Sequence, residues 1–246
     1  MDGTLGVPMR RLFFAVLAVA ALATPALAKT HLVEPHMHIV PVGDAPEVAL
    51  TLDACMGAAD MRIVNALIDN GVAATIFATR RWLLHNPKVV HLLVSHADLF
   101  EIEDHGAEHV PAVIGTEKPY GIAPAGTANG VSNEVLGGAR AVQAASGVAP
   151  HWYRGATALY SKDAMSLIAT MGYRIGGFSL NGDIGASASE KTTETRIASA
   201  RSGDVIISHV NQPTHPAGAG VVEGVLALKA KGFKFVRLED VTETED

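Results

Sequence analysis

Two histidines follow a predicted strand at a spacing that suits a shared metal ion. His105 and His109 stand four residues apart in the segment HGAEH. On one helical turn this spacing places both imidazole rings on the same face, as two ligands of one metal ion must be. The alternative that the pattern leaves open is a pair of solvated histidines on a polar surface turn. The first chemistry that the sequence offers is therefore a divalent metal site.

Four more polar residues stand where predicted strands end. Asp53 closes the apolar run VALTL, and the other three, Arg154, Asp183 and His209, follow later strands. Taken singly, each of these three has a structural explanation: a surface ion pair, a turn, or a histidine satisfied by the backbone. In a barrel of parallel strands, however, the carboxyl ends meet at one edge, where the chemistry of such folds takes place. Their joint placement therefore favours a single catalytic site.

The elements that must position these residues alternate along the chain. Apolar and β-branched runs predict strands over residues 48–53, 72–78, 97–103, 150–154, 173–180, 204–208 and 233–238. Helical periodicity and capping residues predict helices over residues 60–70, 81–95 with an interruption near Pro87, 133–146, 162–171, 190–200 and 219–231. Alternating strands and helices imply parallel pairing through right-handed crossovers, so one barrel-like α/β domain of seven strands is the simplest closure.

A stretch between Val110 and Gly130 is rich in glycine, proline and alanine. It is too long for an ordinary connection in a compact domain, and loops of this kind are usually functional. We expect it to line the rim of the barrel mouth. Ser132 is predicted to cap the helix that follows, over residues 133–146.

Residues 1–28 are predicted to be an export signal rather than part of the fold. Two arginines precede the apolar run 12–23, and the triplet of small, apolar and small residues at 26–28 suits cleavage before Lys29. The run is short for a permanent membrane span, and an uncleaved anchor is the alternative. We therefore expect an exported protein, periplasmic or secreted, with no stable membrane span after cleavage and a catalytic domain over 29–246.

Composition limits the partners of the chain. The formal net charge is −6 and there is no basic block, which argues against nucleic acid and anionic lipid as partners. Cys55 is the only cysteine, so the exported domain has no internal disulfide and is held together by packing. The thiol is either a small buried hydrophobic group or a ligand close to a metal. No obligate protein partner is evident.

The order of these motifs resembles that of the polysaccharide deacetylase family, carbohydrate esterase family four, also called the NodB-homology domain. The segments TLDAC, FEIEDHGAEH, WYRGATALY, GFSLNGD and IISHVNQP follow one another at about the intervals of that family. The resemblance implies an irregular (β/α)7 barrel in a single domain. It also implies metal-dependent hydrolysis of N-acetyl groups, or less often O-acetyl groups, on a glycan such as peptidoglycan or a secreted polysaccharide.

The resemblance further implies a role for each candidate residue. His105 and His109 would hold Zn²⁺ or another divalent transition metal. Asp53 would act as the general base, and Arg154 would keep its carboxylate ionised and oriented.

His209 would act as the general acid, kept protonated by the neighbouring carboxylate of Asp183. The oxyanion that forms during hydrolysis would be stabilised in part by a backbone N–H from the loop near Tyr160. Aromatic residues beside the cleft could also stack on sugar rings, and the candidates are Trp152, Tyr153, Tyr120 and Tyr160.

The first motif departs from the family in a way that affects the metal. The family commonly has Thr-Phe-Asp-Asp, with the second aspartate as the third metal ligand, and here Ala54 takes that place in a divergent TLDAC motif. Catalytic zinc generally has three protein ligands, so a replacement is needed. We rank Asp53 or Asp60 above Cys55, because a thiolate would draw charge into the site and would oxidise readily outside the cytoplasm.

Two alternative functions stay open, the first of them because of this departure. A chain without its third ligand would be a catalytically silent, deacetylase-like protein that binds glycan. The barrel could also host a metal-independent hydrolase of a small amide, whose activity chelation would not change.

Overall fold

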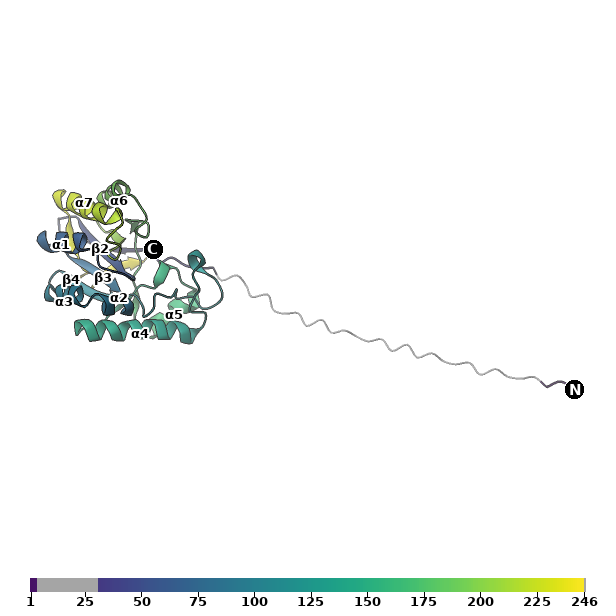
Figure 1. Ribbon diagram of the computed structural model, residues 1–246. Coiled ribbons are helices and arrows are strands. Elements are labelled where there is room, and N and C mark those ends of the chain that lie inside the picture. The colour runs from purple at the N-terminus through teal and green to yellow at the C-terminus, as the bar shows by residue number, and fades with distance from the viewer. Residues whose placement is uncertain (4–30, 246) are drawn as a thin grey trace.

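The computed structural model describes residues 1–3 and 31–245 (Figure 1). The predicted signal peptide, residues 1–28, lies outside the described residues apart from its first three. No helix in the described part of the chain combines the length and the hydrophobicity that crossing a membrane requires.

A curled parallel sheet of eight strands forms the centre of the domain. Along the sheet the strands follow the order β6-β5-β4-β3-β2-β8-β7, and β9 pairs with the first part of β2. The strands are β2 Glu47–Ala54, β3 Ala74–Ala78, β4 Phe100–Asp104, β5 Trp152–Tyr153, β6 Arg174–Ile175, β7 Leu180–Asn181, β8 Val205–His209 and β9 Lys234–Val236. A separate antiparallel pair joins β1 Met37–Ile39 to β10 Glu243–Glu245. The sheet forms a half-barrel, which confirms the predicted α/β class and distorted barrel.

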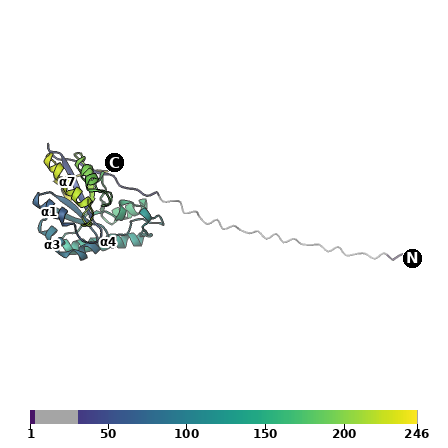
Figure 2. The ribbon, with the colours of Figure 1, turned by 45° about the horizontal axis from the view of Figure 1, so that its top comes forward.

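Seven helices cover the outer face of this sheet. They are α1 Met61–Asp69, α2 Arg80–His85, α3 Pro87–Ser95, α4 Ala128–Ser146, α5 Lys162–Thr170, α6 Glu190–Ala198 and α7 Ala217–Ala230 among the described residues. In Figure 1 α7 lies at the top of the domain and α4 at the bottom, with α1 and α3 between them, and in Figure 2 α7 again lies on the side away from α3 and α4. A polar side chain caps the N-terminus of five of these helices, at Asp60, Thr79, Thr127, Ser161 and Ser189.

Two predicted elements differ from the structure. The single strand expected over 173–180 is two short strands, β6 and β7, at opposite ends of the sheet order. Gly176 and Gly177 lie between them, where an added Cβ would come within 2.5 Å of the Phe77 ring and of the Pro35 carbonyl oxygen respectively. Glycine therefore lets this segment cross the interior of the half-barrel in place of a continuous strand.

The helix expected over 133–146 begins earlier, at Ala128. Its N-cap is Thr127, whose hydroxyl accepts a hydrogen bond from the Gly130 backbone N–H at 3.0 Å. The predicted cap, Ser132, lies inside the first turns of α4. The glycine content of this stretch concealed the helix start, because glycine in the first turns costs only about 1 kcal/mol and tertiary packing can offset that cost.

Alternation along β2 separates the apolar core from the interior of the half-barrel. Leu50, Leu52 and Ala54 point outward into the apolar core between sheet and helices. Thr51 and Asp53 point inward, where both accept a hydrogen bond from the Arg154 side chain. Because side chains in a strand alternate between its two faces, Cys55 is directed to the same side as Asp53.

Two glutamates lie buried on the inner face of β4. Glu101 accepts hydrogen bonds from the backbone N–H groups of Leu238 and Glu239, and Glu103 accepts them from His151 and Trp152. Burial raises the pKa of Glu101 to about 7 and that of Glu103 to about 8, against an ordinary value of 4.5. Hydrogen bonds from the backbone offset only part of this effect.

These raised pKa values predict that stability falls as the pH rises. Between about pH 4.5 and 8 the folded chain keeps the Glu103 proton while the unfolded chain loses it, so the free energy of unfolding decreases across this window. The loss is on the order of a few kcal/mol. In urea denaturation, Glu103→Gln should therefore gain stability relative to the wild type between pH 5 and pH 8. If the difference in the free energy of unfolding between Glu103→Gln and the wild type does not change with pH, Glu103 is ionised throughout. Glu223→Gln, on α7, serves as the control.

Candidate active site

A buried ion pair joins the ends of β2 and β5. Arg154, which is fully buried, donates from Nη1 to Asp53 Oδ1 at 3.0 Å and to Thr51 Oγ1 at 2.8 Å. Its Nε and Nη2 donate to the carbonyl oxygens of Gly176 and Gly177, at 2.9 and 2.8 Å. The segment between β6 and β7 thus fixes the guanidinium, and the guanidinium fixes the Asp53 carboxylate.

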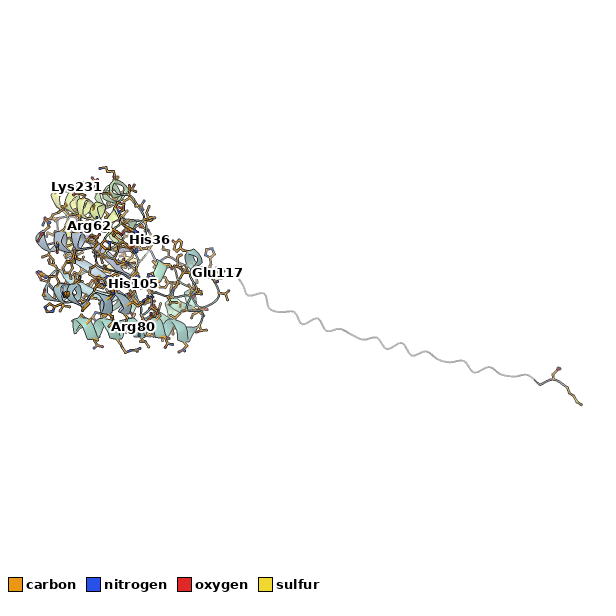
Figure 3. All side chains as sticks on the ribbon, in the orientation of Figure 1. His36, Arg62, Arg80, His105, Glu117 and Lys231 are labelled. Atoms are coloured by element: carbon orange, nitrogen blue, oxygen red, sulfur yellow. The ribbon has the colours of Figure 1, made fainter. Side chains whose placement is uncertain are left out.

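His105, directly after β4, has one ring nitrogen committed to the backbone. Its Nδ1 lies 2.5 Å from the Arg154 carbonyl oxygen, which can only accept, so Nδ1 carries the proton of this hydrogen bond. The other nitrogen, Nε2, lies 3.5 Å from Cys55 Sγ and 3.8 Å from Asp53 Oδ2. Histidines that bind metals typically donate their second N–H to a carbonyl or carboxylate in this way. Figure 3 shows His105 in the body of the domain.

Cys55, His105 and His109 form a group that fits a metal ion. One potential ligand atom from each lies within 4.8 Å of the other two, and the two histidine rings are 5.0 Å apart between centroids. One thiolate and two imidazoles are a donor set that zinc favours, and three protein ligands leave one position open for a reactant.

The other two candidates for the third ligand are each paired with an arginine. Asp60 caps α1, and its carboxylate receives the Arg62 guanidinium, with Oδ2 and Nη2 2.6 Å apart. Asp53 Oδ1 is held by Arg154. Neither aspartate belongs to the group with His105 and His109 among the described residues. The geometry thus favours Cys55, which the sequence ranked last.

A histidine–aspartate pair lies at the end of β8. His209 Nδ1 lies 3.0 Å from Asp183 Oδ1, and the His209 backbone N–H donates to Asp183 Oδ2 at 2.6 Å. Asp183 is fully buried, so its carboxylate is a fixed partner for the ring. In the parallel pairing of β2 with β8, Asp53 and His209 are direct partners in register.

Burial and nearby charges set the protonation states at this site. Burial alone would raise the pKa of Asp53, but His105, Arg154 and His209 outweigh it and hold the pKa below its ordinary value. Burial would likewise lower the pKa of His209, but Asp183 and Cys55 raise it well above the ordinary value. Burial would also raise the pKa of the Cys55 thiol, but the nearby histidines, His105 first and then His109 and His209, lower it well below its usual range. The site therefore holds an ionised carboxylate beside a protonated imidazole.

These side chains line one cavity of about 330 Å³. Asp53, Cys55, His105, His109 and His209 are among its lining residues, while Arg154 and Asp183 support them from behind.

The cavity wall also holds most of the left-handed non-glycine residues of the described chain. They are His109, Tyr120, Thr157, Ala158 and Ile184, with φ between 50° and 72°. In addition, the Thr157 hydroxyl is buried without a hydrogen-bond partner among the described residues. Backbone conformations of this kind cost about 1–3 kcal/mol each and cluster at ligand sites.

A match to a protein family decides the identity of this barrel. The sequence model described as polysaccharide deacetylase matches residues 42–176, more than half of the chain. The chain belongs to the polysaccharide deacetylase family. This confirms the resemblance drawn from the motifs and the enzyme class expected from it, a hydrolase acting on carbon–nitrogen bonds other than peptide bonds. No curated protein matched the chain in sequence.

Solved structures share the deacetylase fold at low sequence identity. A peptidoglycan N-acetylglucosamine deacetylase has a TM-score of 0.66 and 19% identity, over 80% of this chain and 87% of its own. A family 4 carbohydrate esterase from Streptomyces lividans, in complex with acetate, has a TM-score of 0.62 and 20% identity, over 77% and 91%. A CE4 family pseudoenzyme from Bacillus anthracis has a TM-score of 0.65 and 16% identity, over 80% and 66%. At these identities the likeness shows the fold alone.

Of the four aromatic residues considered for sugar stacking in this deacetylase-family chain, the structure leaves one at the surface. Trp152, Tyr153 and Tyr160 are buried, whereas Tyr120 is 77% exposed and lines the cavity. The loop that carries Tyr120 does lie at the cavity, as its composition predicted.

Sequence reasoning missed Glu34, which also lines the cavity. The segment before β1 crosses to the site because Val33 pairs with Tyr160 through two backbone hydrogen bonds, of 2.8 and 2.9 Å. No local pattern signals such a long-range bridge.

Proposed function

We propose that this protein is an exported, metal-dependent hydrolase that removes acetyl groups from the amino sugars of a glycan such as peptidoglycan. The observation that carries the proposal is the convergence of three arrangements on one cavity. These are the Asp53–Arg154 pair, the His209–Asp183 pair and the group of one thiol and two imidazoles. Export rests on the signal predicted over residues 1–28.

The metal would be held by Cys55, His105 and His109. When bound, Zn²⁺ or a similar divalent ion polarises a carbonyl and lowers the pKa of water, which is the chemistry that amide hydrolysis needs. The hydrogen bond from His105 Nδ1 to the Arg154 carbonyl leaves Nε2 as the ligand atom and fixes the plane of the ring. Asp53 stands beside this group without belonging to it.

Asp53 and His209 would transfer the protons of the reaction. Asp53, ionised and fixed by Arg154, accepts a proton from the water that attacks the acetyl carbonyl carbon. His209 gives a proton to the departing nitrogen while Asp183 holds the opposite side of its ring. The C–N bond breaks, and the products are acetate and a free amine on the sugar. The loop that contains Thr157 lines the cavity and would supply the backbone N–H for the oxyanion. The N–H groups of Ala158 and Tyr160 in this loop are already donated to the carbonyl oxygens of Gly155 and Val33, at 3.0 and 2.9 Å.

The alternative is a silent relative that binds glycan without hydrolysing it. It is favoured by Ala54, which stands in place of a usual metal ligand, and by the fold's likeness to the Bacillus anthracis pseudoenzyme. The exposed ring of Tyr120 at the cavity offers a stacking surface for a sugar under either proposal.

Metal removal separates these functions. Purified mature protein, with an N-terminus at Lys29, should contain about one equivalent of zinc or another divalent ion per chain, since the ligand set forms one site. Acetate release from an N-acetylglucosamine oligomer should be abolished by a chelator and restored by Zn²⁺.

If the protein contains no metal and releases no acetate, the result supports the silent glycan binder. Acetate release that survives chelation would instead support a metal-independent hydrolase. In protein expressed from the full sequence and recovered after export, an N-terminus before Lys29 would contradict the predicted cleavage.

A further inference from the structure

A glutamate on α4 holds the loop between the two histidines. The Glu134 carboxylate accepts hydrogen bonds from the backbone N–H of Glu108, at 2.9 and 3.1 Å, and from that of Val110, at 2.9 Å. The Glu134 backbone carbonyl takes the N–H of Ala107 at 3.0 Å. Three of the four N–H groups from Ala107 to Val110 are therefore bound by one residue.

The shape of the loop depends on this carboxylate. Gly106 has a φ of +88°, and a Cβ added to it would come within 2.5 Å of Glu134 Oε1. His109 itself has a φ of 64°, a left-handed conformation that costs a non-glycine residue energy. Backbone N–H groups of one loop that converge in this way form a concave site for an anion. Here the anion is the Glu134 side chain, which is 5% exposed.

This loop conformation sets the direction of the His109 imidazole. With the backbone of 107–110 fixed on Glu134, the His109 ring is directed toward His105 and Cys55 rather than into solvent. The buried carboxylate also adds negative charge behind a loop whose histidines would face a cation. Both effects favour metal binding without a contact between Glu134 and the metal.

We propose that Glu134 is the positioning residue of the metal site: it shapes the His105–His109 loop so that His109 can complete the ligand set with His105 and Cys55. This inference rests on the proposed function, since it presupposes that these three residues bind a metal ion.

The test compares zinc affinity in Glu134→Gln and in a matched control. Glutamine keeps the size of the side chain but replaces one acceptor oxygen by an NH₂ group that faces backbone donors. We expect zinc affinity to fall by roughly 10–100-fold, the usual effect of removing a contact that orients a ligand. The control, Glu108→Gln, removes one charge from the same loop at a side chain that is 45% exposed and pairs with Arg80. It should change the affinity by no more than a few-fold.

Affinity is measured by competition with a chromophoric chelator on metal-stripped mature protein, beside the free energy of unfolding of the metal-free form. A merely structural role would lower stability without changing the affinity of the molecules that stay folded. Glu134→Asp, which keeps the charge but withdraws it from the loop, provides a second variant should Glu134→Gln fail to fold. It should also weaken zinc binding.

Zinc affinity equal to that of the wild type in a folded Glu134 variant would overturn the positioning role and leave the proposed function standing. A wild-type protein that binds no zinc or other divalent ion would overturn both.

Discussion

Replacing Asp53 by asparagine is expected to lower kcat by roughly 10²–10⁴-fold, the range for loss of a general base. Asparagine has nearly the same shape, and its amide oxygen can still accept the hydrogen bond that Arg154 Nη1 gives to Oδ1. It cannot take a proton from water. The fold should persist, at a cost in stability, because the guanidinium keeps Thr51 and two backbone carbonyls as partners. Steady-state rates of acetate release and a thermal unfolding curve measure the two effects.

Thr51→Val provides the control for this experiment. It removes another acceptor of the same guanidinium and therefore loosens Arg154 without touching the proposed base. It should cost stability, by about 1–3 kcal/mol for the buried groups left unpaired, and have a much smaller effect on kcat. Turnover near the wild-type rate in Asp53→Asn would show that Asp53 is not the base. A fall of equal size in Thr51→Val would show that orientation by Arg154, rather than proton transfer, dominates.

Strand ends explain how much of the site could be predicted from the sequence. Asp53 and His209 lie at the ends of β2 and β8, and His105 and Arg154 directly follow β4 and β5. Only β3 separates these four strands in the order of the sheet. Parallel strands in one sheet bring their carboxyl ends together, so the position of each residue along its own strand was sufficient to gather them. The alternation of strands and helices fixed the fold class for the same reason.

The choice of the third metal ligand and the distant contacts of side chains could not be predicted in this way. Asp60 had a local signal as a helix cap, and capping is what it does. The thiol of Cys55 also had a local signal, because alternation along a strand directs a residue two positions after Asp53 to the same side. Its low rank rested instead on the charge and the ready oxidation of a thiolate. Glu34 reaches the cavity through the backbone pairing of Val33 with Tyr160, and the Glu134 carboxylate binds backbone N–H groups of the histidine loop. Such distant contacts leave no pattern in a single sequence. The same is true of Gly176 and Gly177, which split one predicted strand into two.

Loss of the Cys55 thiol is expected to disable metal binding. Cys55→Ser is nearly isosteric, but a serine hydroxyl is a poor ligand, so zinc affinity should fall by more than the ~100-fold that loss of an orienting contact can cost. The rate of acetate release at limiting zinc should fall with it. In the Co²⁺-substituted wild type, a thiolate-to-metal charge-transfer band in the near ultraviolet should be present, and Cys55→Ser should lack it. Zinc bound with unchanged affinity by Cys55→Ser would remove the thiol from the site.

Two further variants show which position can supply the missing carboxylate ligand. Cys55→Asp places a carboxylate on the face of β2 that carries Asp53, and it should recover part of the zinc affinity that Cys55→Ser loses. Ala54→Asp restores the residue usual in the family, but Ala54 is fully buried in the apolar core beneath the helices. A carboxylate there has no partner to offset its desolvation and should destabilise the fold without raising zinc affinity. Higher zinc affinity in Ala54→Asp would show that the end of β2 can turn residue 54 inward, and Cys55 would then be a neighbour of the metal site rather than its ligand.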